Sequence, residues 1–231
     1  DDKNLPAKVI EDVNAGSLRL QQLTGAADSF QFTADDLKDT RHYSNVLFNI
    51  MRGGIFDSNY QIERPDFSQY VFKANKKISA AAQTHLAKLN GNFSLFELKS
   101  IAEQTSNNDL IRLATEYLPL KFSRRHGDPG RPWNQFSINT TDETDGSKIL
   151  DYQGNWRDLF QNWEALAHSY PAFIEGMISK FVNASTFDGY NPYRLMKDGF
   201  EWETIEADNP WSYIGYWGDH QIIYLLKFLE F

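Results

Sequence analysis

The sequence has no cysteine, so it can form neither a disulfide framework nor a thiolate metal site, and cysteine pairing says nothing about its compartment. No apolar run approaches the roughly 18 residues of a membrane span, and the start, Asp1-Asp2-Lys3-Asn4, is no signal peptide. Basic residues are outnumbered: the net charge of -8 argues against nucleic acid as the general partner. We expect a soluble globular chain without a membrane span, cytoplasmic rather than exported.

Aromatic residues are plentiful, and every tryptophan lies from Trp133 onward. Tryptophan and tyrosine present flat apolar faces with a polar edge, which is typical of carbohydrate sites and of interfaces. An aromatic-rich core is an equally good interpretation. Composition alone does not decide between the two.

Residues 1–118 are predicted to form a helical segment of antiparallel helix pairs. The cap at Ser94, with Glu97 three residues later, is the capping-box pattern, and Thr33 is an expected cap further upstream. The expected elements are a weak helix over 6–24, a short one over 33–40, a helix over 42–54 ended by glycines, an extended run over 55–62, and helices over 65–89, from 94, and over 110–118.

Residues 119–150 change character and are predicted to be a basic loop or linker. Lys121, Arg124, Arg125 and Arg131 crowd a stretch that holds too many prolines and glycines for a helix. The guanidinium group of arginine can bind two oxygens of a phosphate or carboxylate at once. Arg124, Arg125 and Arg131 are therefore candidate phosphate ligands. Salt bridges from this loop to acidic helices are the competing interpretation.

A helix is predicted to begin after Asn155, a plausible N-cap. Its apolar stripe, which would lie against the core, consists of Trp156, Leu159, Phe160, Trp163 and Ala167. The adjacent stripe places donors beside acceptors, a pattern suited to sugar hydroxyls, and consists of Arg157, Asp158, Gln161 and Asn162. A local ion pair combined with a capping box would also explain it.

The remaining elements are a helix from Pro171, a hairpin with Asp198-Gly199 as its two-residue loop, and an apolar helix over 221–231 that we expect to be buried all round. Glu201 and Glu203 share one face of the second hairpin strand. They could do acid/base work, but a solvated face is the simpler interpretation. Asp219 lies at the start of the 221–231 helix, where its carboxylate could cap the helix or contact a ligand.

The last third of the chain resembles the catalytic domain of the cellobiose phosphorylase-like inverting glycoside phosphorylases. Tyr152-Gln-Gly-Asn-Trp-Arg-Asp-x-x-Gln-Asn is similar to that family's Tyr-Arg-Asp-x-x-Gln-Asp segment, and Gly218-Asp-His to its Ser-Asp-Asp segment, with His220 in place of the second aspartate. The resemblance implies that 151–231 is part of an (α/α)6 barrel with a small β-hairpin. It also implies that Arg157 and Asp158 hold sugar hydroxyls, and it adds Trp156, Gln161 and Asp219 as substrate contacts.

The family's general acid lies in a Trp-Asn-Asp-Gly stretch that this sequence does not contain, so we assign no catalytic residue. An (α/α)6 barrel needs twelve helices, and the patterns predict about seven, so we expect a piece of a longer polypeptide. The leading hypothesis is inverting cleavage of glycosidic bonds in a disaccharide or oligosaccharide, by phosphorolysis rather than hydrolysis. It needs no metal or cofactor, and inorganic phosphate would be the co-substrate.

Two alternatives remain open at this point. One is a non-catalytic helical carbohydrate-binding or scaffold domain. The other is a hydrolase that uses carboxylates already present, such as Glu201, Glu203 or Asp219, one of them with a raised pKa.

Overall fold

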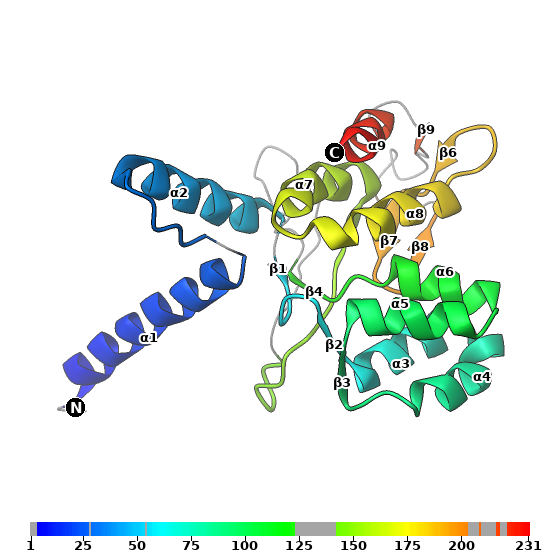
Figure 1. Ribbon diagram of the computed structural model, residues 1–231, viewed down its shortest axis with the longest axis horizontal. Helices are drawn as coiled ribbons and strands as arrows, with labels where there is room; N and C mark the ends of the chain where they lie inside the picture. Colours follow the sequence, from blue (N-terminus) through cyan, green and yellow to red (C-terminus); the bar gives the residue numbers. More distant parts are fainter. Residues whose placement is uncertain are drawn as a thin grey trace.

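The chain is mainly helical in a computed structural model that describes residues 4–27, 29–53, 55–122, 142–202, 208, 216–217 and 221–231. Side chains at 49–53, 55, 121–122, 155–158, 161–162, 165, 216–217 and 221 lie outside the description. Within the described part, helices alternate with short antiparallel strand pairs, as Figure 1 shows. The predicted mainly α fold class is confirmed.

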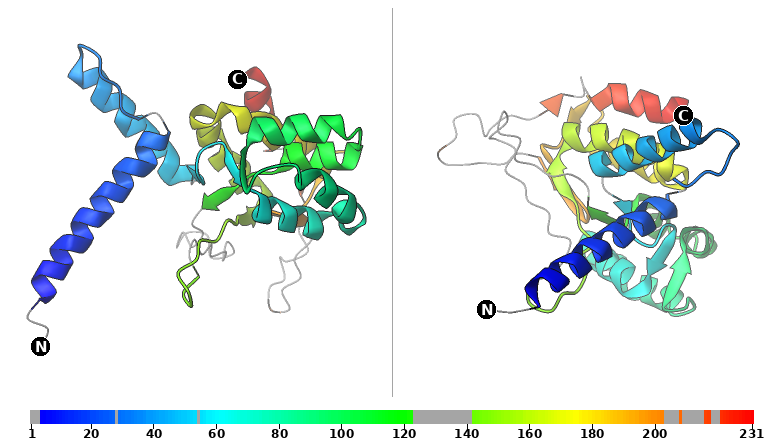
Figure 2. Two further views of the ribbon diagram at one scale, coloured as in Figure 1. Left: turned by 60° about the horizontal axis from the view of Figure 1, so that its bottom comes forward. Right: turned by 90° about the vertical axis from the view of Figure 1, so that its left-hand side faces the viewer.

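Two long helices form an arm beside the body of the molecule. Helix α1 spans Leu5–Ala26 and α2 spans Asp36–Gly53. Figure 2 shows α1 extending away from the body, whereas α2 reaches it at its C-terminal end and packs against α7. Most of the apolar side chains of α1 are exposed, as the weak periodicity of that segment predicts.

The start of α2 corrects one prediction. The Asp35 carboxylate accepts hydrogen bonds from the backbone N–H groups of Leu37 and Lys38, both at 3.1 Å, so Asp35 is the cap. The Thr33 hydroxyl instead donates to Asp39 at 2.7 Å. The two helices expected over 33–40 and 42–54 are one continuous helix, because nothing between them interrupts the backbone bonding.

Residues 61–116 form a four-helix unit around a short strand pair. Its elements are β2 (Gln61–Glu63), α3 (Arg64–Ala74), α4 (Lys76–Leu86), β3 (Asn92–Ser94), α5 (Leu95–Gln104) and α6 (Asn108–Glu116). Strands β2 and β3 pair antiparallel, with buried Ile62 opposite buried Phe93. The predicted capping box of Ser94 and Glu97 is confirmed.

The single helix predicted over 65–89 is wrong, because Asn75 divides it. Its backbone N–H closes α3 on the Val71 carbonyl at 2.9 Å, while its side chain accepts from Lys77 N at 3.1 Å and so begins α4. Asparagine favours such caps over helix interiors, since its side chain competes for backbone groups.

The C-terminal part joins helices to a three-stranded sheet. Strand β5 (Gln153–Asn155) pairs with β7 (Arg194–Met196), which pairs with β8 (Gly199–Glu201). Its remaining elements are α7 (Trp156–Ser169), the 3-10 turn η1 (Pro171–Phe173), α8 (Ile174–Ala184), β6 (Tyr190–Asn191), β9 (Tyr216–Trp217) and α9 (Gln221–Glu230). Strands β1 (Ile55–Phe56) and β4 (Leu120–Phe122) form a further antiparallel pair. They lie just before and just after the four-helix unit in the sequence.

The hairpin after α8 is confirmed, with its loop shifted by one residue. Gly199 pairs with Met196, so the loop consists of Lys197 and Asp198 rather than Asp198 and Gly199. This shift points Lys197 inward, where its side chain is buried. The position of this turn is what creates the site described below.

Buried side chains from the end of α1 to α9 form one continuous apolar core. The predicted stripe of α7 is confirmed where the side chains are described, with Leu159, Phe160 and Trp163 fully buried. The expectation for 221–231 is wrong: α9 packs on α7 and α8 with Leu225 and Phe228 buried and Tyr224 partly buried, and its other face is exposed. In the described part of the chain, no helix has the length and apolar character needed to cross a membrane.

Candidate functional site

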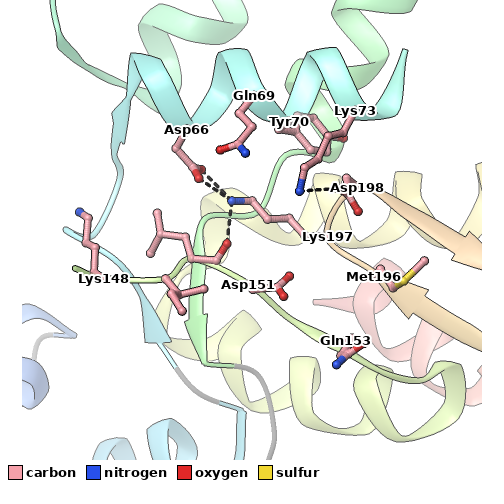
Figure 3. Close-up of a pocket in the computed structure, with 12 residues that line it drawn as sticks. Asp66, Gln69, Tyr70, Lys73, Lys148, Asp151, Gln153, Met196, Lys197 and Asp198 are labelled. Atoms are coloured by element: carbon pink, nitrogen blue, oxygen red, sulfur yellow. Dashed lines mark hydrogen bonds and ion pairs between the residues drawn. The ribbon is translucent and has the colours of Figure 1, made fainter. Parts of the chain in front are cut away.

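A polar cavity of about 370 Å³ lies where the four-helix unit meets the sheet of the C-terminal part. Figure 3 shows α3 along one side, with the 148–153 segment and the β7–β8 turn opposite. Helix α3 supplies Asp66, Gln69, Tyr70 and Lys73, which follow the i, i+3, i+4, i+7 spacing of a single helix face. The other walls are formed by Lys148, Ile149, Leu150, Asp151, Gln153, Met196, Lys197 and Asp198.

A largely buried ion pair between Lys197 and Asp66 lies at one end of the cavity, and we call it the clasp. The Lys197 ammonium lies 2.7 and 2.8 Å from the two Asp66 oxygens and donates to the Leu150 carbonyl at 2.8 Å. The Tyr117 hydroxyl also donates to Asp66. Burial, and then the negative charge of Asp66, raise the pKa of Tyr117 well above its ordinary value, so it stays a hydrogen-bond donor.

Two further ion pairs flank this clasp. Lys73 lies 3.3 Å from Asp198 across the cavity mouth, with both side chains partly exposed. Lys148 bridges Asp57, at 2.5 Å, and Glu63. Burial lowers the pKa of Lys148, but the hydrogen bonds to these two carboxylates outweigh it, and the net direction is upward.

Three carboxyl groups of the described residues line the cavity, those of Asp66, Asp151 and Asp198. Asp151 is the one that has no ion-pair partner among the described residues. Its Oδ1 accepts the backbone N–H of Tyr152 at 2.8 Å. Burial raises the pKa of Asp151, against the lowering effects of that hydrogen bond and of Lys197. A carboxyl group in this position can either accept a hydrogen bond or, when protonated, donate one.

Two amide side chains complete the cavity. Gln69 and Gln153 form no side-chain hydrogen bond with any described residue, and both line the cavity (Figure 3). Each amide offers two donor hydrogens and an acceptor oxygen. Together with Asp151, they give an array of unused donors and acceptors, which suits a neutral ligand rich in hydroxyl groups.

The residues predicted as substrate contacts are only partly covered by the structure. Trp156, Arg157, Asp158 and Gln161 lie in the first two turns of α7, immediately after β5, but their side chains are outside the described set. The predictions at Asp219 and at Arg124, Arg125 and Arg131 also fall outside the described residues. All of these therefore stay predictions.

Sequence reasoning missed the cavity itself. Its α3 wall lies in the segment that was predicted only as a helix over 65–89, with no site residue assigned to it. Glu201, a candidate for acid/base work, forms a cross-strand pair with Arg194 at 3.5 Å. Glu203 lies outside the described residues.

The aromatic residues divide between the two interpretations left open above. Trp163 is fully buried in the core, whereas Trp202 is partly exposed and stacks on Tyr190, with ring centroids 5.7 Å apart and an interplanar angle of 7°. Phe200 lies edge-on to Trp202 and is also exposed. The hairpin thus carries an accessible aromatic surface.

Residues 56–119 match the family model described as glycoside hydrolase family 149 insertion domain 1. The matched range covers the four-helix unit and therefore the α3 wall of the cavity. This similarity relates the chain to the glycoside hydrolases and phosphorylases and indicates a region of a carbohydrate-active enzyme. It concerns a different part of the chain from the cellobiose phosphorylase-like motif, and it does not single out that group. Comparison with curated proteins gives no match.

Proposed function

We propose that the chain is a segment of an enzyme that cleaves glycosidic bonds with inversion, by phosphorolysis rather than hydrolysis. The observation that carries the proposal is the match of 56–119 to an insertion domain of a glycoside hydrolase family. The Tyr152–Asn162 motif supports it independently, because the resemblance assigns Arg157 and Asp158 to sugar hydroxyls. These two supports come from separate stretches of one sequence.

An inverting mechanism needs two participants, an acid and a nucleophile. An acid protonates the leaving oxygen, and a nucleophile attacks from the opposite face of the sugar ring. In a phosphorylase, inorganic phosphate is that nucleophile, so no protein base is required. Arg124, Arg125 and Arg131 are the proposed phosphate contacts, and the (α/α)6 barrel is the proposed architecture around the donor sugar.

The cavity beside α3 is the proposed saccharide-binding site within this chain. Gln69, Gln153 and Asp151 would exchange hydrogen bonds with hydroxyl groups, since a hydroxyl both donates and accepts. The volume of about 370 Å³ lies toward the lower end of the roughly 300–1,000 Å³ usual for ligand sites. It fits a short saccharide rather than a long chain.

The reaction is tested by incubating the full-length enzyme that contains this segment with a panel of α- and β-linked disaccharides, with and without inorganic phosphate. Proton NMR would detect a sugar 1-phosphate and give its anomeric configuration. The proposal predicts phosphate-dependent product with inverted configuration, lost on Arg157→Met or Asp158→Asn. Retained configuration, or turnover unaffected by either substitution, would contradict it.

A second function, non-catalytic carbohydrate binding, is favoured by one observation: the matched family model describes an insertion domain, not a catalytic domain. It predicts that saccharides raise the unfolding temperature of the chain while no product forms under either condition. The product assay and the unfolding measurement together separate the two functions.

A further inference from the structure

A second cavity, of about 310 Å³, lies on the other side of Tyr70 and Asp198, between α3, α6, α8 and the hairpin. Its floor contains Lys180 of α8, which is 6% exposed. At the rim are Arg112, Asn183 and the exposed ring of Phe200. The cavity therefore descends from an accessible edge to a buried ammonium group.

The ammonium group of Lys180 makes one hydrogen bond to the described residues and lies near two aromatic rings. Its Nζ donates to the Lys197 carbonyl at 3.1 Å and lies 5.9 and 5.6 Å from the ring centroids of Tyr70 and Tyr152. An ammonium group has three donor hydrogens, and the described residues accept one of them. No carboxylate in the described part of the chain lies within ion-pair distance of this nitrogen.

The other charges around the cavity are already paired. Arg112 lies 3.4 Å from Glu116, which also accepts from the Asn183 amide at 2.5 Å. Asp198 is paired with Lys73 at 3.3 Å. Once these pairs cancel, one positive charge remains, and it belongs to Lys180.

A buried, unpaired charge is energetically unfavourable, and a counter-charge delivered with its own hydrogen-bond acceptors relieves that cost. Arg112 strengthens the case, because a guanidinium has five donors and its bonds to Glu116 use Nη1 alone. We propose that this cavity binds a small oxyanion, with one oxygen on Lys180 Nζ and another on the unused donors of Arg112. The proposal is independent of the saccharide-binding function.

The protonation state of Lys180 is compatible with this role. Burial lowers its pKa to about 8, so most of the group is charged at neutral pH. Facing it are Glu116 and Arg112 from α6, Tyr70 from α3, Tyr152 before β5, and Lys197 and Asp198 from the turn. An anion bound here would raise the pKa of Lys180, and its affinity would fall as the pH rises above about 8.

The test is thermal unfolding of the full chain with inorganic phosphate, sulfate, acetate or glucuronate, each against sodium chloride of equal ionic strength. The phosphate and carboxylate arms distinguish the two sources of an oxyanion. We expect at least one of them to raise the unfolding temperature progressively with the logarithm of its concentration, by about 3 °C at ten times its dissociation constant. Lys180→Met should fold, because methionine matches the buried stem of the lysine, and should lose the shift, whereas Lys99→Met on α5 should keep it.

NMR of the lysine Nζ–H groups in the unsubstituted chain gives a readout that does not depend on the variant folding. The Lys180 signal should move on titration with the same anion, and half of the movement should occur at the dissociation constant found by unfolding. The proposal is overturned if no oxyanion exceeds the chloride control, if Lys180→Met keeps the full shift, or if the Lys180 signal does not respond.

Discussion

The Lys197 ammonium and the Asp66 carboxylate are 131 positions apart in the sequence and meet at 2.7 and 2.8 Å. This pair joins the turn of the β7–β8 hairpin to the first turn of α3, and so joins the two parts of the chain that form the cavity. Both side chains are largely buried, at 11% and 20% exposure. The clasp therefore both sets the shape of the site and affects stability.

Asp66→Asn should lower the free energy of unfolding by about 2–4 kcal/mol, because it leaves the Lys197 ammonium buried without a counter-charge. Urea unfolding followed by circular dichroism measures the change. Glu164→Gln, which breaks the exposed pair with Lys227 at 2.6 Å, is the matched control and should cost less than about 1 kcal/mol. Equal effects of the two substitutions would show that the clasp does not stabilise the junction.

Gly176→Ala should destabilise the packing of α8 on α6. A Cβ at this position would lie 2.4 Å from the Thr115 carbonyl oxygen, a backbone atom that cannot move without shifting α6. We expect a loss of about 2–3 kcal/mol. The control is Gly16→Ala in α1, where a Cβ meets nothing within 4 Å, and which should leave stability unchanged or raise it by up to about 1 kcal/mol.

Lys180 should make stability rise with pH in a defined window. Its pKa is about 8 in the folded chain and near its ordinary value of 10.5 when unfolded, so between these values the unfolded state binds more protons. Stability therefore increases with pH across that window. Subtracting the pH profile of Lys180→Met isolates this contribution from the tyrosines, and a difference that is flat from pH 8 to 10 would rule out a buried charged lysine.

Asp151 should act in the opposite direction and at lower pH. Burial raises its folded-state pKa above the ordinary 3.8, so between the two values the folded state binds more protons and stability falls as the pH rises. Asp151→Asn preserves the acceptor for the Tyr152 N–H and removes the titration. The variant should therefore be more stable than the original chain at neutral pH and lack this fall, and an unchanged profile would count against a buried carboxyl.

Local patterns predicted much of the fold. The capping box at Ser94, the buried stripe of α7 and the hairpin before Gly199 depend on neighbours within a few residues, and the structure has all three. The break at Asn75 was missed because asparagine inside a run of helix formers gives a weak signal. The exposed face of α9 was missed because an apolar pattern does not say which neighbour covers it.

The cavities could not be predicted, for a different reason. The walls of the first come from α3, the 148–153 segment and the β7–β8 turn, and those of the second from α3, α6, α8 and the hairpin. No local spacing reports that these elements meet. The pairing of Lys197 with Asp66 depends on a hairpin loop shifted by one residue from the expected position. In the sequence, Lys197 and Asp66 look like ordinary surface charges.

The most direct test of carbohydrate recognition is titration of a disaccharide and oligosaccharide panel into the full chain by isothermal calorimetry. Gln69→Leu removes an amide from the cavity wall, and Gln83→Leu makes the same change on the exposed face of α4, away from it. The account predicts that at least one saccharide binds and that Gln69→Leu weakens it by at least about fivefold, since hydroxyl groups lose a partner, while Gln83→Leu leaves it unchanged. If no saccharide binds, or if both variants bind like the original chain, the cavity is not a saccharide site.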